Sequence, residues 1–170
     1  MRRVLVIGSG GAGKSTLSAR LGEALGLEVL HLDAHHWRAG WTEPPKEEWQ
    51  RIVAGLIERD SWVMDGNYSG TLEMRMEACD TVVFLDLPRT LCLWRVIKRL
   101  LTYRGRPRPD MAEGCGEKLD LKFLRWVWDY PERTRPVVLG LIRAHGRDKK
   151  IFHLRSRAEV AEFLREVGGA

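Results

Sequence analysis

The feature that most constrains this chain is a glycine-rich stretch directly after a short apolar run. Residues 8–15 read Gly-Ser-Gly-Gly-Ala-Gly-Lys-Ser, and residues 4–7 before them are all apolar. The spacing matches the pattern G-x-x-x-x-G-K-[ST] in full, and leucines at helical spacing follow it. Backbone N–H groups of such a loop can wrap a phosphate because glycine permits positive φ angles. The stretch therefore predicts a strand, a phosphate-binding loop and a helix, in that order.

Each residue type in this loop has an expected partner on a nucleoside triphosphate. Lys14 reaches the β- and γ-phosphates, the Ser15 hydroxyl ligates Mg²⁺, and Thr16 is placed for the α-phosphate. The helix N-terminus adds about half an elementary positive charge. ATP is favoured over GTP because the sequence lacks the Asn-Lys-x-Asp pattern that reads guanine. The residues expected to bind ATP here are Gly8, Ser9, Gly10, Gly11, Ala12, Gly13, Lys14, Ser15 and Thr16.

Apolar runs alternate with helical stripes along the rest of the chain. Strands are predicted at 4–7, 28–32, 61–64, 81–85 and 151–154, and helix-period segments separate most of them. This alternation is typical of a parallel sheet with crossover helices. Residues 137–141 begin with two valines, but we assign them to a helix that Pro131 and Pro136 delimit. The prediction is an α/β fold with five strands, in one domain that spans residues 1–170.

Composition and charge narrow the partners. The formal net charge of +5 and the pI of about 9.4 lead us to expect an anionic partner. A nucleotide phosphate, a phosphorylated acceptor and a nucleic acid are all compatible with that charge. The three cysteines lack the paired spacing of a zinc site, and the apolar runs are too short to span a membrane. We expect a cytoplasmic protein without a membrane partner.

One segment breaks the alternating pattern. Residues 102–118 contain three glycines, two prolines and three arginines without apolar periodicity. A long segment of this composition is typical of a functional loop, and its arginines favour a lid over phosphates.

Aspartates follow three of the predicted strands. Asp33, Asp65 and Asp86 stand at these carboxyl ends, where ligands of open α/β sheets bind. Mg²⁺ prefers carboxylates, waters and phosphate oxygens. Asp33 and Asp65 are therefore candidate catalytic residues, and Asp65 is a candidate metal ligand together with Ser15. Asp86 precedes Leu87-Pro88, and we interpret it as a strand end or helix cap.

Further residues extend the pattern over nearly the whole chain: 7–16, 31–33, 40–41, 62–68 with Asp-Gly-Asn-Tyr at 65–68, Arg75, 78–86, Arg95, Arg99 and 108–111. On these residues the chain resembles the small phosphate-loop kinases related to adenylate and shikimate kinases. It is most similar to the bacterial FlaR-type topology modulation proteins, which are described as adenylate-kinase-like. The phosphate loop is shared by very many proteins, whereas Asp-Gly-Asn-Tyr followed by Arg75 is much more particular.

The resemblance implies a sheet in the order 2-3-1-4-5 with a lid over the phosphates. Asp65-Gly66 is similar to the Asp-Gly after strand three of adenylate kinases, although Asn67-Tyr68 stands here where Phe-Pro-Arg follows there. Arg99 resembles the arginine that precedes the lid and lies against the ATP base. Arg157 lies in a segment that resembles the loop bordering the adenine.

Residues near the second and third strands are expected to bind the phosphoryl acceptor: Asp33, Trp37, Trp41, Tyr68 and Arg75. The planar fork of Arg75 suits a phosphate, and the aromatic rings offer stacking surface for a nucleoside. For the two tryptophans, packing beneath the loop is the alternative. Phosphoryl transfer needs positive charge around the migrating group, for which the sequence offers Arg95, Arg99, Arg104, Arg106, Arg108, Arg133 and Arg135.

The favoured function is phosphoryl transfer from ATP, with Mg²⁺, to a small-molecule acceptor such as a nucleoside or nucleoside monophosphate. In that reaction Lys14, Asp33, Asp65 and Arg99 are the expected catalytic residues. The alternative is a nucleotide-dependent regulator that binds DNA, which the pI and the resemblance both suggest. A DNA-binding protein should show a basic stripe or a recognition helix, and the sequence shows neither, so nucleic acid is possible but not favoured. Hydrolysis of ATP without an acceptor is a third hypothesis.

Overall fold

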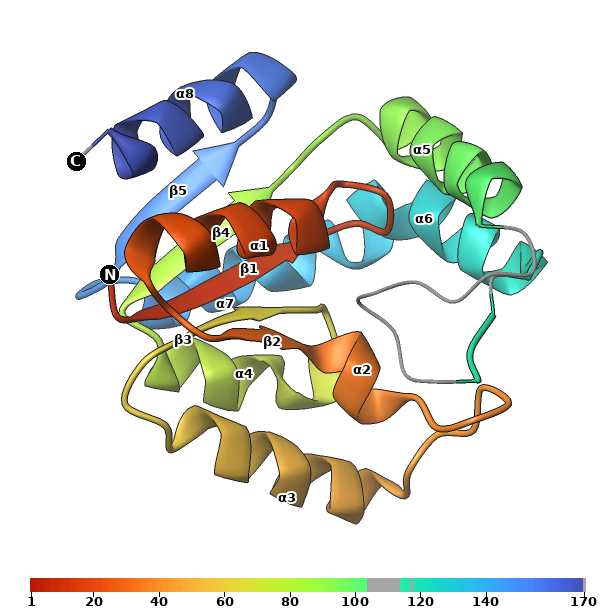
Figure 1. Ribbon diagram of the computed structural model, residues 1–170, viewed down its shortest axis with the longest axis horizontal. Coiled ribbons are helices and arrows are strands. Elements are labelled where there is room, and N and C mark those ends of the chain that lie inside the picture. The colour runs from red at the N-terminus through yellow and green to blue at the C-terminus, as the bar shows by residue number, and fades with distance from the viewer. Residues whose placement is uncertain (104–113, 117, 170) are drawn as a thin grey trace.

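The computed structural model describes residues 1–103, 114–116 and 118–169. Five strands form one parallel sheet in the order β2-β3-β1-β4-β5, which confirms the order that the resemblance implied (Figure 1). In the central pairs Val4 lies opposite Val63 on one side and Thr81 on the other. The strands are β1 (Arg3–Gly8), β2 (Val29–His31), β3 (Trp62–Asp65), β4 (Thr81–Leu85) and β5 (Lys150–Leu154).

Helices cover both faces of the sheet. One face packs against α1 (Lys14–Leu25), α5 (Arg89–Thr102) and α8 (Arg157–Gly168). The other face packs against α3 (Lys46–Ile57), α4 (Ser69–Ala78) and α7 (Arg135–His145). The remaining helices are α2 (Leu32–His36) and α6 (Leu121–Arg133), and α6 contributes residues to both cores. In Figure 1 both chain ends lie at the left, and the strands point toward the right-hand end.

The alternation of side chains along β1 explains why it is apolar throughout. Val4 and Val6 pack toward α1, whereas Leu5 and Ile7 pack toward α3 and α4. All four are fully buried. A strand covered on both faces needs apolar residues at every position.

The structure corrects two of the predicted boundaries. The second strand ends at His31 rather than residue 32, and a short helix, α2, follows it. Leu32 and His36 are four residues apart and both buried, so one helical turn carries both into the core. Pro131 does not interrupt α6 but lies inside it, near the end, where a missing N–H affects only the last turn. Residues 137–141 are helical, as expected.

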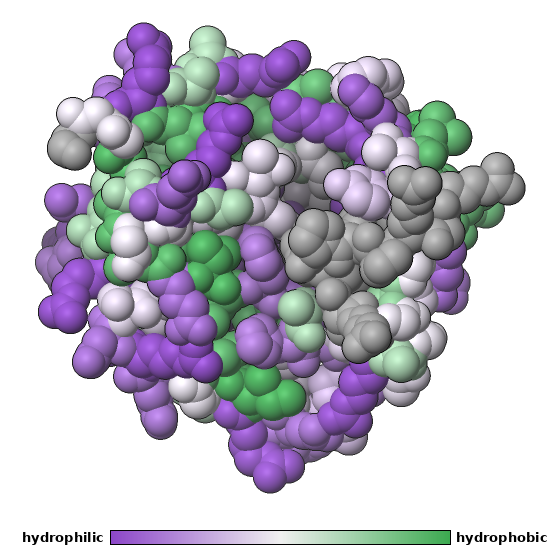
Figure 2. Space-filling model, viewed as in Figure 1, coloured by the Kyte–Doolittle hydropathy of each residue, from purple (hydrophilic) through white to green (hydrophobic). Residues whose placement is uncertain are grey.

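The predicted lid at 102–118 falls mainly outside the described residues, at 104–113 and 117, and Arg104, Arg106 and Arg108 lie there. Residues 114–116 are described and contact the loop after α2: the Gly40 amide donates to the Gly114 carbonyl at 3.3 Å. The surface in Figure 2 is mostly hydrophilic, with apolar residues in small separate patches. Within the described ranges, no helix is both long and apolar enough to cross a membrane.

Candidate active site

The phosphate loop joins β1 to α1 at the carboxyl edge of the sheet. Gly11 and Gly13 adopt left-handed backbone angles, with φ of 77° and 98°. A Cβ on Gly11 would lie 2.2 Å from the carbonyl oxygen of Cys92 in α5. Glycine is therefore required at position 11 both for its backbone angle and for the close approach of α5.

The loop fits a bound phosphate. The amides of Gly11 and Gly13 donate to no acceptor within the described part of the chain. No side chain caps the N-terminus of α1, and the amides of a first helical turn have no acceptor within the helix, so these donors are also available to a ligand. The Lys14 ammonium donates instead to the carbonyls of Gly8 and Ser9, each at 3.0 Å. The loop thus offers unused donors and a cation held on its own backbone.

Asp65 lies on the α1 side of the sheet. Trp62 and Met64 pack toward α3 and α4, whereas Val63 packs toward α1, so alternation turns Asp65 to the side of Val63. The carboxylate is buried and bonds Nδ1 of His31 at 2.8 Å. The structure therefore brings Asp65 to the same face as the start of α1, where the Ser15 hydroxyl lies.

Asp33 was expected at a strand end but lies in α2, because β2 stops two residues earlier. Its Oδ1 accepts a hydrogen bond from the Tyr68 hydroxyl at 2.6 Å. Burial and the nearby Asp33 carboxylate raise the pKa of Tyr68, so the hydroxyl stays protonated and donates. Asp33 is thus fixed on the side of the site where Tyr68 lies.

The pKa of Lys14 depends on the charged side chains near the phosphate loop. Burial lowers its pKa, while the carboxylates of Asp33 and Asp65 raise it and the guanidinium of Arg99 lowers it. These three side chains therefore lie within electrostatic reach of the ammonium. Three of the predicted catalytic residues, Asp33, Asp65 and Arg99, are thus within electrostatic range of the fourth, Lys14.

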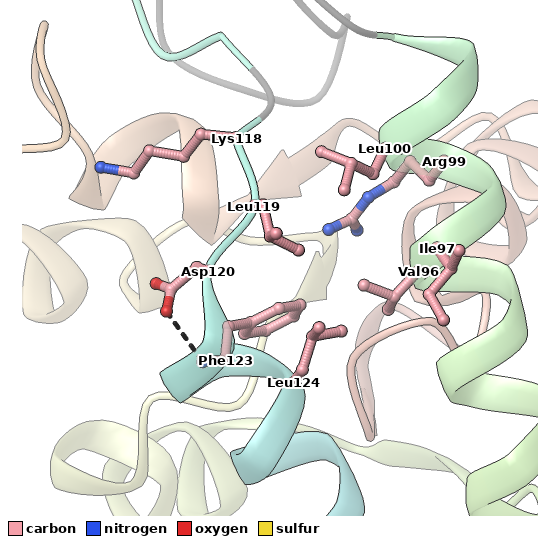
Figure 3. Close-up of a pocket in the computed structure, with 9 residues that line it drawn as sticks. All are labelled: Val96, Ile97, Arg99, Leu100, Lys118, Leu119, Asp120, Phe123 and Leu124. Atoms are coloured by element: carbon pink, nitrogen blue, oxygen red, sulfur yellow. Dashed lines mark hydrogen bonds between the residues drawn. The ribbon is translucent and has the colours of Figure 1, made fainter.

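Two arginines of α5 face the phosphate loop. Arg95 donates to the carbonyls of Ala12 at 3.1 Å and Gly11 at 3.4 Å. The Arg99 guanidinium lies 5.8 Å from the ring centre of Phe123 and extends into the gap between α5 and α6 (Figure 3). That gap has a volume of about 30 Å³, enough for one or two waters. The Arg99 guanidinium also lowers the pKa of Lys14, so it lies within electrostatic range of the phosphate loop.

The structure contradicts the expected role of Arg75 in acceptor binding. Its side chain is fully buried. The guanidinium donates to four carbonyls: those of Thr71 at 3.2 Å, Gly66 at 2.9 Å, Tyr68 at 3.0 Å, and Asn67. Burial lowers the pKa of Arg75 to about 9, which still leaves it charged at neutral pH. Arg75 therefore holds the backbone after β3 and offers no fork to a ligand.

The two tryptophans that were expected near the acceptor contact each other and are half-buried. Trp37 and Trp41 meet edge to face at 5.2 Å between ring centres. The Trp41 indole donates to the Gly116 carbonyl at 3.1 Å, and the Lys118 ammonium lies 5.3 Å from its ring centre. Trp41 thus joins the loop after α2 to the segment before α6.

Asp86 directly follows β4, and Arg157 begins α8, which follows β5. Arg157 is exposed at the start of α8. Asp86 accepts hydrogen bonds from Arg135 at 2.9 Å and contacts Nε2 of His153 at 2.7 Å. Asp86 therefore joins the ends of β4 and β5 to α7, which agrees with a structural role.

Sequence reasoning missed Asn67. Its side chain pairs with both backbone groups of Gly8, accepting from the amide at 3.2 Å and donating to the carbonyl at 2.6 Å. The sequence signal was the departure from the adenylate kinase pattern after Asp65-Gly66, but that signal does not indicate a partner.

A cavity of about 340 Å³ adjoins this segment. It lies between the start of α4 and the junction of α6 with α7. Arg133 is the only charged residue among the described residues that line it, and its Nε lies 3.8 Å from Asp129. The lining residues are Asn67, Tyr68, Ser69, Leu72, Trp126, Arg133, Thr134, Val137 and Val138.

Comparisons with known proteins agree with the fold. No protein-family model matches the chain. The uncharacterized protein YqaC of Bacillus subtilis (strain 168) is 26% identical over 146 residues, which are 85% of this chain and 81% of that protein. Shikimate kinase from Acinetobacter baumannii, solved in complex with shikimate, is similar with a TM-score of 0.61 at 17% identity, covering 98% of this chain and 90% of that chain. Shikimate kinase from Bacteroides thetaiotaomicron is similar with a TM-score of 0.55 at 17% identity, covering 99% of this chain and 96% of that chain.

The chain therefore has the fold of the small phosphate-loop kinases. This agrees with the wider resemblance drawn from the sequence. The narrower likeness to the FlaR-type group remains a resemblance of sequence.

Proposed function

We propose that the chain is an ATP- and Mg²⁺-dependent phosphotransferase whose acceptor is a small molecule. The observation that carries the proposal is the gathering of Lys14, Asp33, Asp65 and Arg99 around a phosphate loop with unused amide donors. Phosphoryl transfer depends on positioning and on positive charge around the migrating group, and these residues supply both. Similarity in fold to kinases that act on small molecules supports the proposal.

The residues divide the work by their place in the site. Lys14 exchanges its loop carbonyls for the β- and γ-phosphates, and Arg99 adds a second cation above the loop. Ser15 and Asp65 are the residues that would hold Mg²⁺, which when bound neutralises charge between these phosphates.

Asp33 is the proton acceptor in this scheme, because it bonds Tyr68, which also lines the cavity. The acceptor oxygen forms a bond to the γ-phosphorus, while the bond from phosphorus to the β–γ bridging oxygen breaks. The hydroxyl proton passes to Asp33, and ADP leaves with the electron pair.

The cavity beside Asn67 is the proposed acceptor site. Its volume of about 340 Å³ is in the range of small-molecule sites. Arg75 is buried, so the role of binding an anionic group of the acceptor is assigned to Arg133 instead. The side chain of Arg133 is 76% exposed. Arg133 favours an acceptor with a phosphate or carboxylate group.

The test is ADP release measured with purified protein, MgATP and a panel of nucleosides, nucleoside monophosphates, sugars and shikimate-like acids. We expect an anionic acceptor to raise ADP release above the rate with water alone. Arg133→Ala should then raise the KM for that acceptor about tenfold with little change in the KM for ATP. If no acceptor raises the rate but DNA does, the phosphotransferase proposal fails and the regulator takes its place.

Asp65→Asn tests the metal role. We expect kcat to fall about 30- to 100-fold, because an amide does not replace a carboxylate beside Mg²⁺, while affinity for ATP changes by less than about threefold. Turnover assays with a Mg²⁺ titration measure kcat, and titration calorimetry measures the affinity for ATP. Asp60→Asn, on the exposed turn before β3, is the matched control. Unchanged turnover in the Asp65 variant would move the metal role to Asp33.

A further inference from the structure

The carbonyl of Gly8 accepts two hydrogen bonds from side chains. One comes from the Lys14 ammonium at 3.0 Å and the other from the Asn67 amide at 2.6 Å. Gly8 is buried, so water cannot easily replace either donor. We propose that Asn67 is a positioning residue that keeps this carbonyl bonded when Lys14 leaves it for the phosphates. The inference rests on the nucleotide binding proposed above.

Lys14 holds two carbonyls in the nucleotide-free loop, and it must release both to reach a triphosphate. The carbonyl of Ser9 keeps a second donor, the amide of Ala12 at 3.2 Å. The carbonyl of Gly8 keeps Asn67. A buried acceptor left without a donor is unfavourable, and this arrangement leaves neither acceptor without one. Lys14 can therefore change partners with little loss in the loop itself.

The side-chain amide of Asn67 takes the place of the next hydrogen-bonded residue between β1 and β3. Pairing of β1 with β3 runs to Val6 opposite Asp65, and the Gly66 amide still reaches the Val6 carbonyl at 3.4 Å. Beyond that point the side chain of Asn67 bonds both the amide and the carbonyl of Gly8, as a neighbouring strand would. This two-point contact fixes Gly8, the first residue of the phosphate loop.

The buried Arg75 presets the position of Asn67. Its guanidinium donates to the backbone carbonyls of Gly66, Asn67 and Tyr68. Tyr68 has a φ of 33°, an unusual angle for a residue with a side chain, and these bonds help to hold it. The Asn67 amide is thus directed at Gly8 before any ligand binds, which is how a supporting shell preserves a site.

The experiment compares wild type with Asn67→Ala for binding of a nonhydrolysable MgATP analogue by titration calorimetry. We expect affinity to fall about tenfold, while the midpoint of thermal unfolding without nucleotide stays within a few degrees of wild type. The rise in that midpoint on adding the analogue should shrink. A purely structural role would instead lower the nucleotide-free midpoint and leave the affinity of the folded protein unchanged. Gln50→Ala, which removes an exposed side-chain amide on α3, is the matched control.

Asn67→Asp is the second variant, because it keeps the shape of the side chain, removes the donor to Gly8 and adds a negative charge whose effect can be tested with salt. We expect the affinity of this variant for the MgATP analogue to fall at least as far as that of Asn67→Ala, at both about 0.05 M and about 0.5 M NaCl. Recovery to wild-type affinity at high salt would assign the loss to long-range charge and overturn the inference, since salt screens such charge but does not restore a donor. If wild type fails to bind the analogue, the phosphate-loop function fails as well. If wild type binds and Asn67→Ala binds equally, only the role of Asn67 is wrong.

Discussion

Replacing Lys14 by alanine is expected to lower the turnover of ATP about a thousandfold in a protein that remains folded. The ammonium is the cation closest to the expected β- and γ-phosphates, and its hydrogen bonds in the nucleotide-free form go only to the loop carbonyls of Gly8 and Ser9. Both carbonyls keep another donor, so the loop should hold its shape. ADP release and nucleotide affinity measure the loss, and circular dichroism with thermal unfolding checks the fold.

The matched control for this experiment is Lys46→Ala, an exposed lysine at the start of α3. It removes the same charge at a distance from the phosphate loop and should leave turnover unchanged. Turnover and affinity at the wild-type level in folded Lys14→Ala would refute the phosphate-loop assignment, and with it the proposed function.

Replacing Arg75 by alanine is expected to lower the free energy of unfolding by about 3–5 kcal/mol. The change removes the guanidinium donor from four carbonyls, of which that of Tyr68 keeps other donors, the amide and hydroxyl of Thr71. It also opens space in the core beside Leu72 and Met76. A loss of that size is a large part of the stability of a typical domain, so the variant should unfold at much lower urea concentration. Urea denaturation followed by tryptophan fluorescence measures it.

Arg75→Lys should lie between alanine and wild type, because lysine keeps the charge but not the planar set of five donors. Arg133→Ala, which removes an exposed arginine, should change stability by less than about 0.5 kcal/mol. Wild-type stability in Arg75→Ala combined with weaker acceptor binding would return Arg75 to the ligand-binding role that the sequence suggested.

The two arginines show how far residue type alone carries an argument. Arg75 lies in the helix after β3 and Arg133 ends α6, and the side chains of both can bind a phosphate. Arg75 turns into the core because α4 packs between α3 and α7, and its guanidinium there meets the carbonyls of residues 66–68. Arg133 ends α6 and faces the cavity. Only the packing of the helices separates these two outcomes.

The phosphate loop was predictable because its constraints are local. The glycines, Lys14 and Ser15 form one motif within eight residues, and the apolar run before them and the leucines after them specify a strand and a helix. The alternation of apolar runs with helical stripes likewise indicated a parallel sheet, whose strand order came from the family resemblance. The face to which Asp65 turns needed the register of β3, which the sequence did not supply.

The sequence by itself therefore determined the α/β class, the phosphate loop and the positions of Asp65 and Asp86 at strand ends, because each follows from neighbours a few residues away. The tertiary structure decided the helix α2 that carries Asp33, the burial of Arg75 and the pairing of Asn67 with Gly8. That last contact joins residues 59 positions apart. The physical reason is that a polar side chain takes the strongest partner within reach, and what lies within reach is set by the packed chain rather than by adjacent residues.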